Sequence, residues 1–315
     1  MNPAMRRVAL IYNPASGQSS SRRSAAIEQI LGVLRAAGVE AEAFETGAPG
    51  SATILAKRAA ATGFDTVFAC GGDGTVHEVA QSLVDTEVAL GVIPQGTANA
   101  LAADLDLAGK PARAAEKLLQ SAPVRISVGR IHYQDLAGKP GARYFLVAAG
   151  VGADALLMAR LDARLKRKLG YILYLIEAWR IWATSSFPLF EAVLQDGRKL
   201  KISQLLAVRV RSFGGVLREL APGASLRNGS LSLLVFKTQS RWRYLRFLMA
   251  ALAGRQKSTP AVELVETPSI ECLPQNGSRE TLFVEADGEV LGTLPVRLEV
   301  VPHALTLLIP PGVRP

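Results

Sequence analysis

The sequence predicts an α/β N-terminal domain with a parallel sheet, followed by a C-terminal antiparallel β-sandwich domain. Two observations support this fold class. Up to about residue 125, short apolar runs alternate with segments of helical periodicity, which is the order of a parallel sheet with crossover helices. Beyond that point, short alternating runs are separated by Asp-Gly and Asn-Gly turn signals, which are typical of antiparallel strands. We therefore expect domains over 1–125 and 126–302.

The first domain contains four predicted strands, each followed by a helical segment. The strands are the apolar runs at 7–12, 39–44, 66–70 and 89–93. The helical segments lie at 24–37, 51–61, 76–83 and from about 100 to 120. Each strand ends in a polar turn, and the carboxyl ends of parallel strands meet at one edge of the sheet. Four polar turns at one edge favour a binding site there.

The second domain is predicted from short runs of alternating polarity. These runs lie at 125–132, 144–149, 190–195, 205–210, 231–236, 269–273, 281–285, 296–300 and 305–309. Helical segments at 155–183 and 241–257 interrupt them, and both combine basic residues with Trp and Tyr. That combination suits a helix in a membrane interface, and equally a helix packed on the sandwich with a solvated basic face. The pattern leaves both open.

The composition excludes several classes of protein. With 49% hydrophobic and 20% charged residues, the chain can bury a large core and is not disordered. The formal net charge of +9 indicates an anionic partner, and no nucleic-acid-binding module accompanies it, so we expect no nucleic acid. Cys70 and Cys272 stand far apart without metal-ligand spacing, which fits a reduced setting.

The apolar runs of the chain are all short. None reaches the ~18 residues of a spanning helix, and the N-terminal run is too short for a signal peptide. We therefore expect a cytoplasmic protein that makes peripheral contact with an anionic membrane surface. Exposed strands of the second domain leave a homodimer open.

The most informative stretch is the glycine-rich turn Gly71-Gly72-Asp73-Gly74-Thr75, between a buried apolar run and a helical segment. Glycines let the backbone approach an anion closely, and the N–H groups at a helix start favour phosphate. Asp73 adds a carboxylate, a ligand that suits Mg²⁺. The alternative is a plain strand-to-helix turn. The presence of both Asp and Thr favours phosphate binding.

Several motifs in order along the chain resemble one family. They are NPASG at 13–17, GGDGT at 71–75, PQGTAN at 94–99, FGGVLRELAPGASLRNGSL at 213–231 and EADGEVLGTLPVRLEVVPHALTLLIP at 285–310. The chain resembles the lipid kinases that share the diacylglycerol kinase catalytic domain, in particular their soluble bacterial branch. The resemblance implies transfer of the γ-phosphoryl group of ATP to a lipid alcohol, with Mg²⁺, in a cleft between two domains. It also implies that the last residues, 303–315, return to the first domain.

The resemblance also assigns roles to residues. It places the nucleotide against Asn13, Pro14, Ala15, Ser16, Gly17, Thr46, Gly71, Gly72, Asp73, Gly74, Thr75, Val76, His77 and Thr97. Glu289 would accept the hydroxyl proton, with Asp287 beside it and Asp73 completing the catalytic set. Taken alone, Asp287-Gly288-Glu289 is an ordinary hairpin turn signal.

Three positions depart from the family pattern. His77 stands where relatives usually have Asn, and Ala100 stands where many have Asp, with Asp104 one helical turn further. A structural metal of the bacterial members would be held here by Ser225, Asn228 and Ser230. Since Asn228 replaces an aspartate, we expect the affinity for Mg²⁺ to fall.

Two other functions stay open. NAD kinases resemble the chain at GGDG and share the two-domain plan, but their acceptor is a soluble dinucleotide. The motif NPASG and the terminal Asp-Gly-Glu turn favour a lipid kinase. A non-catalytic regulator that binds nucleotide or lipid is the third possibility, because His77 and Ala100 alter the site.

Overall fold

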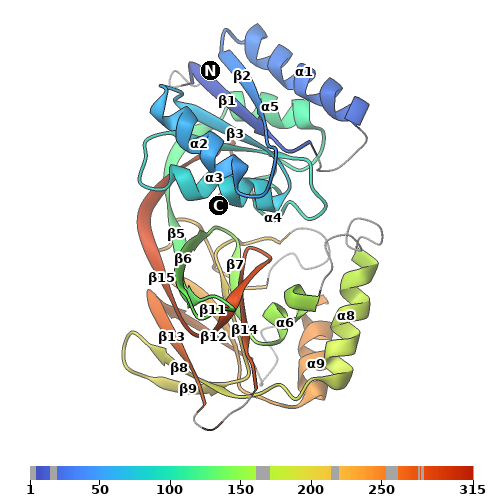
Figure 1. Ribbon diagram of the computed structural model, residues 1–315, viewed down its shortest axis with the longest axis vertical. Helices are drawn as coiled ribbons and strands as arrows, with labels where there is room; N and C mark the ends of the chain where they lie inside the picture. The colour runs from blue at the N-terminus through green and yellow to red at the C-terminus, as the bar shows by residue number, and fades with distance from the viewer. Residues whose placement is uncertain are drawn as a thin grey trace.

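The computed structural model describes residues 5–14, 20–160, 171–213, 220–252, 262–275, 277 and 280–314. The chain forms two domains that lie end to end, with the N-terminal domain at the top of Figure 1. The predicted fold class, an α/β domain followed by an antiparallel β domain, is confirmed.

A parallel sheet forms the centre of the first domain. Its strands are β1 (Arg7–Tyr12), β2 (Glu40–Glu45), β3 (Thr66–Gly71) and β4 (Ala89–Pro94), in the order β4-β3-β1-β2. β3 and β4 are buried along their whole length, as expected of continuous apolar runs in a parallel sheet. The helices are α1 (Ser20–Ala36), α2 (Ser51–Ala61), α3 (Asp73–Leu83), α4 (Ala100–Asp104) and α5 (Pro111–Leu119). α1 packs with α5 and α2 packs with α3, on opposite faces of the sheet (Figure 1).

The second domain is antiparallel. Its strands are β5 (Ala122–Gln134), β6 (Pro140–Phe145), β7 (Ala148–Val151), β8 (Phe190–Leu194), β9 (Lys199–Ile202), β10 (Gln204–Val208), β11 (Leu231–Phe236), β12 (Val262–Thr267), β13 (Ser269–Pro274), β14 (Phe283–Ala286) and β15 (Glu289–Ile309). β7 pairs with both β10 and β14, and β14 pairs with β15. This pairing carries the turn between β14 and β15 to the face of the domain that meets α3.

β15 joins the two domains. Its first part pairs with β13 and β14, and its last part pairs in parallel with β4, where Thr306 lies beside Ala89 and Leu307 beside Leu90. β5 runs antiparallel to β15 over most of its length, as the long strand at the left of Figure 1 shows. Leu305, Leu307 and Leu308 belong to the apolar core of the first domain. The end of the chain is therefore part of the first sheet.

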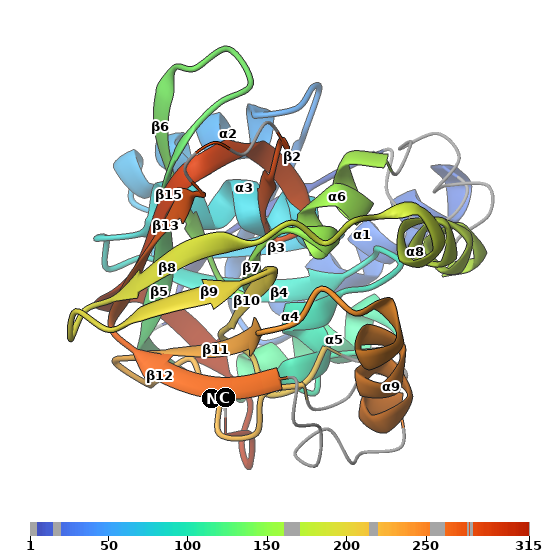
Figure 2. The ribbon, with the colours of Figure 1, turned by 90° about the horizontal axis from the view of Figure 1, so that it is seen from below.

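Three helices lie along one side of the second domain. They are α6 (Ala153–Arg160), α8 (Tyr171–Thr184) and α9 (Arg241–Leu252). α8 and α9 lie side by side in Figures 1 and 2, and the rings of Trp182 and Trp242 meet edge to face at 5.3 Å. No helix within the described ranges is both long and apolar enough to cross a membrane.

Several boundaries differ from the sequence prediction. α3 begins at Asp73, inside the glycine-rich turn, rather than at residue 76. The helical stretch 100–120 divides into α4 and α5. The runs at 296–300 and 305–309 form one strand, β15, with a register shift near His303, whose φ is +50°. Of the predicted helix 155–183, residues 161–170 lie outside the described part, as do 253–257 of the predicted helix 241–257.

Candidate active site

The glycine-rich turn links β3 to α3, and its geometry requires glycine. A Cβ atom on Gly71 would lie 2.4 Å from Oγ1 of Thr75. A Cβ atom on Gly96, in the turn after β4, would lie 2.5 Å from the Cα atom of Gly72. Atoms cannot approach this closely, so the turn after β3 requires glycine at position 71, and the close contact between the two turns requires glycine at position 96. The result is a helix N-terminus surrounded by backbone groups, an arrangement that suits phosphate.

Asp73 ties these two turns together. Its Oδ2 atom accepts a hydrogen bond from the N–H of Asn99 at 2.9 Å, and its Oδ1 atom accepts one from Ala100 at 2.8 Å. Burial raises the pKa of Asp73, and the two backbone hydrogen bonds oppose that rise. Asp73 therefore fixes the shape of the turn through both carboxylate oxygens. Its catalytic role stays a prediction.

The predicted nucleotide residues gather at the carboxyl edge of the first sheet. The N–H of Asn13 donates to the carbonyl of Cys70 at 3.2 Å, and the N–H of Thr46 donates to that of Tyr12 at 2.9 Å. The ends of β1, β2 and β3 are therefore adjacent, with Pro14 next to Asn13 and Thr97 exposed in the turn after β4. The predicted residues Ala15, Ser16 and Gly17 lie outside the described residues.

The turn between β14 and β15 faces this edge from the second domain. Asp287 and Gly288 have φ angles of +47° and +83°. A two-residue hairpin turn of type I′ needs positive φ at both positions, which Asp and Gly tolerate. The turn places Glu289 at the first position of β15.

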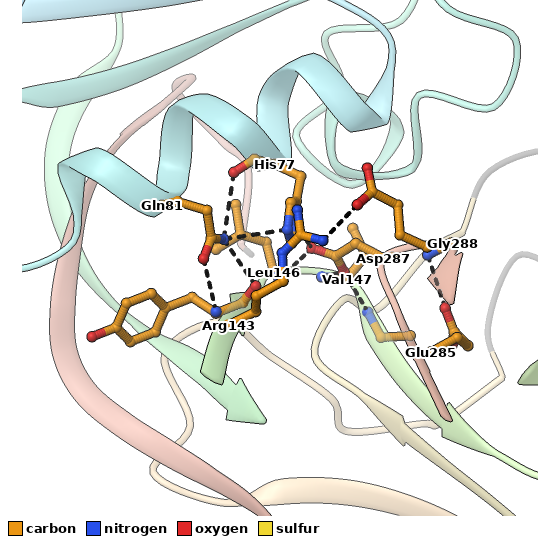
Figure 3. A network of polar contacts seen from close by, with 11 residues as sticks. His77, Gln81, Arg143, Leu146, Val147, Glu285, Asp287 and Gly288 are labelled. Atoms are coloured by element: carbon orange, nitrogen blue, oxygen red, sulfur yellow. Dashed lines mark hydrogen bonds and ion pairs between the residues drawn. The ribbon is translucent and has the colours of Figure 1, made fainter. Parts of the chain in front are cut away.

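Asp287 is held by four hydrogen bonds. Its Oδ2 atom accepts from Nδ1 of His77 at 3.0 Å and from the N–H of Leu146 at 2.9 Å. Its Oδ1 atom accepts from the N–H groups of Val147 at 2.9 Å and Ala148 at 3.1 Å (Figure 3). The side chains of His77 and Asp287 are only 2% and 4% exposed. This contact joins α3 of the first domain to the hairpin of the second.

Glu289 has a different environment. Its side chain is 41% exposed, and its Oε1 atom lies 3.8 Å from where a Cβ atom on Gly74 would stand. Its Oε2 atom accepts a hydrogen bond from Nη1 of Arg143 at 2.6 Å. The carboxylate therefore faces the glycine-rich turn from across the domain interface, within reach of a group bound there.

The side chain of Gln81 anchors α3 to β6 beside the Arg143 position. Its Nε2 atom donates to the carbonyl of Tyr144 at 3.0 Å, and its Oε1 atom accepts from the N–H of the same residue at 3.0 Å (Figure 3). The helix that begins at the glycine-rich turn is thus fixed to the strand that carries Arg143.

A pair of acidic side chains lies behind the hairpin turn. Oε2 of Glu285 accepts from the N–H of Gly288 at 2.8 Å, and its side chain is hydrogen bonded to that of Asp154. A Cβ atom on Gly150 would lie within 3 Å of both carboxyl groups, so glycine there lets them meet. Burial and the charge of Asp154 raise the pKa of Glu285 well above its ordinary value.

The residues predicted to hold a structural metal are otherwise engaged. The carbonyl of Ser230 accepts from Nη1 of Arg209 at 2.6 Å, and the carbonyl of Ser225 accepts from the N–H of Asn228 at 3.1 Å. Within the described ranges, no three His, Cys, Asp or Glu side chains cluster as metal ligands. The oxygen atoms present do not fit a divalent cation at this turn.

Two features of the site carried no sequence signal. Arg143 lies in a segment where polar and apolar residues alternate. Its sequence context is that of an ordinary basic residue exposed to solvent. The contact between His77 and Asp287 joins residues 210 positions apart. The prediction that His77 contacts nucleotide stays a prediction, and the structure gives its side chain a partner in the second domain.

Comparison with known proteins identifies the family. The family model of the diacylglycerol kinase catalytic domain matches residues 7–131. That of the YegS C-terminal NAD kinase beta sandwich-like domain matches residues 146–309. The chain belongs to the diacylglycerol kinase catalytic-domain family. The predicted family is thereby confirmed, and with it the expectation of a kinase.

Two bacterial diacylglycerol kinases align along most of the chain. Diacylglycerol kinase of Bacillus subtilis is 30% identical over 296 residues, which cover 92% of each protein. Diacylglycerol kinase of Mycobacterium tuberculosis is 30% identical over 314 residues, 96% of this chain and 95% of that one.

Solved structures support the same fold. A diacylglycerol kinase structure from Bacillus anthracis has a TM-score of 0.76 at 23% identity, covering 99% of this chain and 100% of that one. Yeast NADH kinase in complex with NADH has a TM-score of 0.54 at 9% identity, covering 98% and 85%. The second likeness concerns the fold alone.

Proposed function

We propose that the protein transfers the γ-phosphoryl group of ATP to the hydroxyl group of a diacylglycerol-like lipid alcohol. The observation that carries the proposal is the position of Glu289. Its carboxylate faces the glycine-rich turn across the domain interface, with Oε1 3.8 Å from the Cβ position of Gly74. A phosphate cradle and a carboxylate on opposite sides of one gap are what phosphoryl transfer to an alcohol needs.

The first domain supplies the nucleotide side of the reaction. The triphosphate lies against the turn formed by Gly71, Gly72 and Gly74, where the N–H groups at the start of α3 neutralise part of its charge. Glycine at positions 72 and 96 lets the backbones of the two turns lie in close contact beside this surface. The turns after β1, β2 and β4 surround the remainder of the nucleotide.

Glu289 acts as the general base. The lipid hydroxyl oxygen attacks the γ-phosphorus, the bond from that phosphorus to the β,γ-bridging oxygen breaks, and ADP leaves. The hydroxyl proton passes to the Glu289 carboxylate. Being 41% exposed and held at one oxygen, this carboxylate can accept the proton at the other. All four hydrogen bonds of Asp287 are already made, so Asp287 positions the hairpin.

Arg143 supports the transfer. Its guanidinium holds the Glu289 carboxylate in place and adds positive charge beside the γ-phosphate. A guanidinium offers five donors, so Arg143 can contact Glu289 and a phosphate oxygen together.

The turn has carboxylates that would suit Mg²⁺. Asp73, within the turn, and Glu289, opposite it, would hold the ion, because carboxylate oxygens are ligands that Mg²⁺ prefers. When bound, the ion neutralises charge on the transferring phosphoryl group. Asp73 meanwhile keeps its two backbone hydrogen bonds.

The acceptor comes from a membrane, and α8 and α9 form the surface that meets it. Of the eight large apolar side chains exposed in the described ranges, five lie on these two helices: Ile176, Trp179, Trp242, Leu248 and Met249. Arg241, Arg243 and Arg246 are exposed on α9. Trp beside arginine suits the headgroup region of an anionic bilayer. α6 contacts both α8 and β14 and so connects these helices to the hairpin that carries Glu289.

A screen of the purified protein with labelled ATP against a lipid panel tests the proposal. The panel contains diacylglycerol, monoacylglycerol, a sphingoid base, ceramide and phosphatidylglycerol, and NAD is tested in parallel. We expect label in at least one lipid. Appearance of NADP would instead assign a soluble acceptor, and ATP binding without any labelled product would assign a regulator.

A further inference from the structure

Arg209 is a buried cation with an unusual set of partners. It follows β10, is 1% exposed, and is the largest side chain among those fully buried in the described residues. Its Nη2 atom donates to the carbonyls of Ser127 at 3.1 Å, Asn228 at 3.1 Å and Leu226 at 3.3 Å. Its Nη1 atom donates to the carbonyl of Ser230 at 2.6 Å. Four backbone oxygens thus surround one positive charge.

The charge has no acidic counterpart in the part of the chain that the structure describes. An arginine guanidinium is always protonated at neutral pH, so Arg209 carries a full positive charge inside the domain. A buried charge is tolerated when oriented dipoles replace its hydration. Here the carbonyl dipoles of the 226–230 turn and of β5 do so, as carbonyl oxygens do around a bound metal ion.

The carbonyl groups of the turn already accept hydrogen bonds. The carbonyls of Asn228 and Ser230 point at Arg209. The carbonyl of Ser225 accepts from the N–H of Asn228, whose side-chain Nδ2 donates to Gly223 at 2.9 Å. A divalent ion beside these oxygens would be repelled by the guanidinium and would find no carboxylate among Ser225, Asn228 and Ser230.

We propose that the guanidinium of Arg209 is the resident cation of the 225–230 turn, and that it does there what a divalent metal ion would do. The second domain then folds and keeps its shape without a metal ion at this turn. The arrangement bears on the catalytic hairpin. The N–H of Arg209 donates to the carbonyl of Val147 at 2.9 Å, and the N–H of Val147 donates to Oδ1 of Asp287 at 2.9 Å.

The first test uses the unaltered protein without nucleotide. Its Tm is measured after chelation with EDTA and again with excess Mg²⁺ or Ca²⁺, and we expect the same Tm in all conditions. A fall on chelation is then examined in Asp73→Asn, which weakens the nucleotide site. If chelation still lowers the Tm of this variant, the proposal is overturned. If chelation no longer lowers its Tm, the metal ion belongs to the nucleotide site and the proposal holds.

The second test exchanges one cation for the other. Arg209→Met leaves four carbonyls without a donor, and we expect its Tm to fall by roughly 5–10 °C. The double variant Arg209→Ser with Asn228→Asp frees these carbonyls and adds a carboxylate. We expect its Tm to rise when Mg²⁺ or Ca²⁺ is added. If the double variant folds and its Tm does not change when either ion is added, the proposal that Arg209 takes the place of a metal ion is contradicted. A Tm of Arg209→Met equal to that of the unaltered protein would contradict it as well.

Discussion

The guanidinium of Arg143 lies 2.6 Å from the carboxylate of Glu289, at the point where the two domains meet. Arg143 is on β6 and Glu289 begins β15, so the pair joins two strands of the second domain beside the start of α3. The side chains are 26% and 41% exposed. A half-exposed ion pair contributes little to stability, and its place opposite the glycine-rich turn is consistent with the role proposed for it in the reaction.

Removing the charge of Arg143 tests that role. We expect Arg143→Gln to lower kcat for lipid phosphorylation by roughly 10²-fold, because it takes a donor from the transferring phosphate and frees Glu289 to turn away. Arg143→Lys keeps the positive charge but loses the planar guanidinium that can donate to two acceptors side by side. We expect it to recover part of the rate. The measurement is steady-state transfer of label from ATP. Equal rates for Arg143→Gln and the unaltered enzyme would exclude Arg143 from the transfer.

A substitution at Gly74 tests whether the glycine-rich turn binds phosphate without disturbing the fold. A Cβ atom there meets Glu289 Oε1 at 3.8 Å, an ordinary contact, so Gly74→Ala should fold with an unchanged Tm. The methyl group would stand where the proposed function places the phosphates, and we expect the KM for ATP to rise about tenfold. Gly96→Ala is the contrast, since its Cβ would lie 2.5 Å from the Cα of Gly72 and should lower the Tm. A normal KM in Gly74→Ala would place the nucleotide elsewhere.

Gly74 and Arg143 differ in how far the sequence alone could predict their roles. The turn at Gly74 was predictable, because glycines with Asp and Thr between an apolar run and a helical segment are typical of a phosphate-binding turn. The role of Arg143 was not, because its partner is 146 positions away and the two strands that carry them are brought together by β5, which pairs with both β6 and β15. The contact between His77 and Asp287 was not predictable either, because 210 positions separate them.

The fold shows a similar division. The strands of the first domain were predictable because apolar runs in a parallel sheet are continuous. β9 (Lys199–Ile202) and β12 (Val262–Thr267) were missed, since exposed charged residues interrupt their apolar pattern. The sequence predicted two strands where the structure has the single strand β15. Pro302 and His303 separate its two apolar runs, and the register shifts at this point.

The buried acidic pair predicts a pH dependence of stability. The pKa of Glu285 is raised in the folded state, so the folded protein keeps this proton longer than the unfolded chain does. Stability is therefore full below the ordinary pKa of 4.5 and is lost as the pH rises toward the raised value, by about 1.4 kcal/mol per pH unit. Glu285→Gln should reduce this loss while still accepting from Gly288. Parallel curves of Tm against pH for the two proteins, from about pH 5 to about pH 8, would contradict the assignment.

The α8 and α9 surface predicts binding to anionic vesicles. Trp179 and Trp242 are 65% and 66% exposed, and we expect replacement of either by Ala to weaken binding to phosphatidylglycerol-containing vesicles about tenfold. Ile54 on α2 is 71% exposed and serves as the control, because Ile54→Ala should bind as the unaltered protein does. Binding is measured by cosedimentation. Equal binding by all three variants would remove α8 and α9 as the contact surface.

Glu289→Gln is the most direct test of the central claim, which is that this carboxylate takes the proton of the lipid hydroxyl. The substitution keeps the size of the side chain and removes its basicity. We expect phosphoryl transfer to the best lipid of the panel to fall by roughly 10²–10⁴-fold, while calorimetry shows ATP binding unchanged. Transfer at the rate of the unaltered enzyme, with ATP bound equally well, would contradict the account.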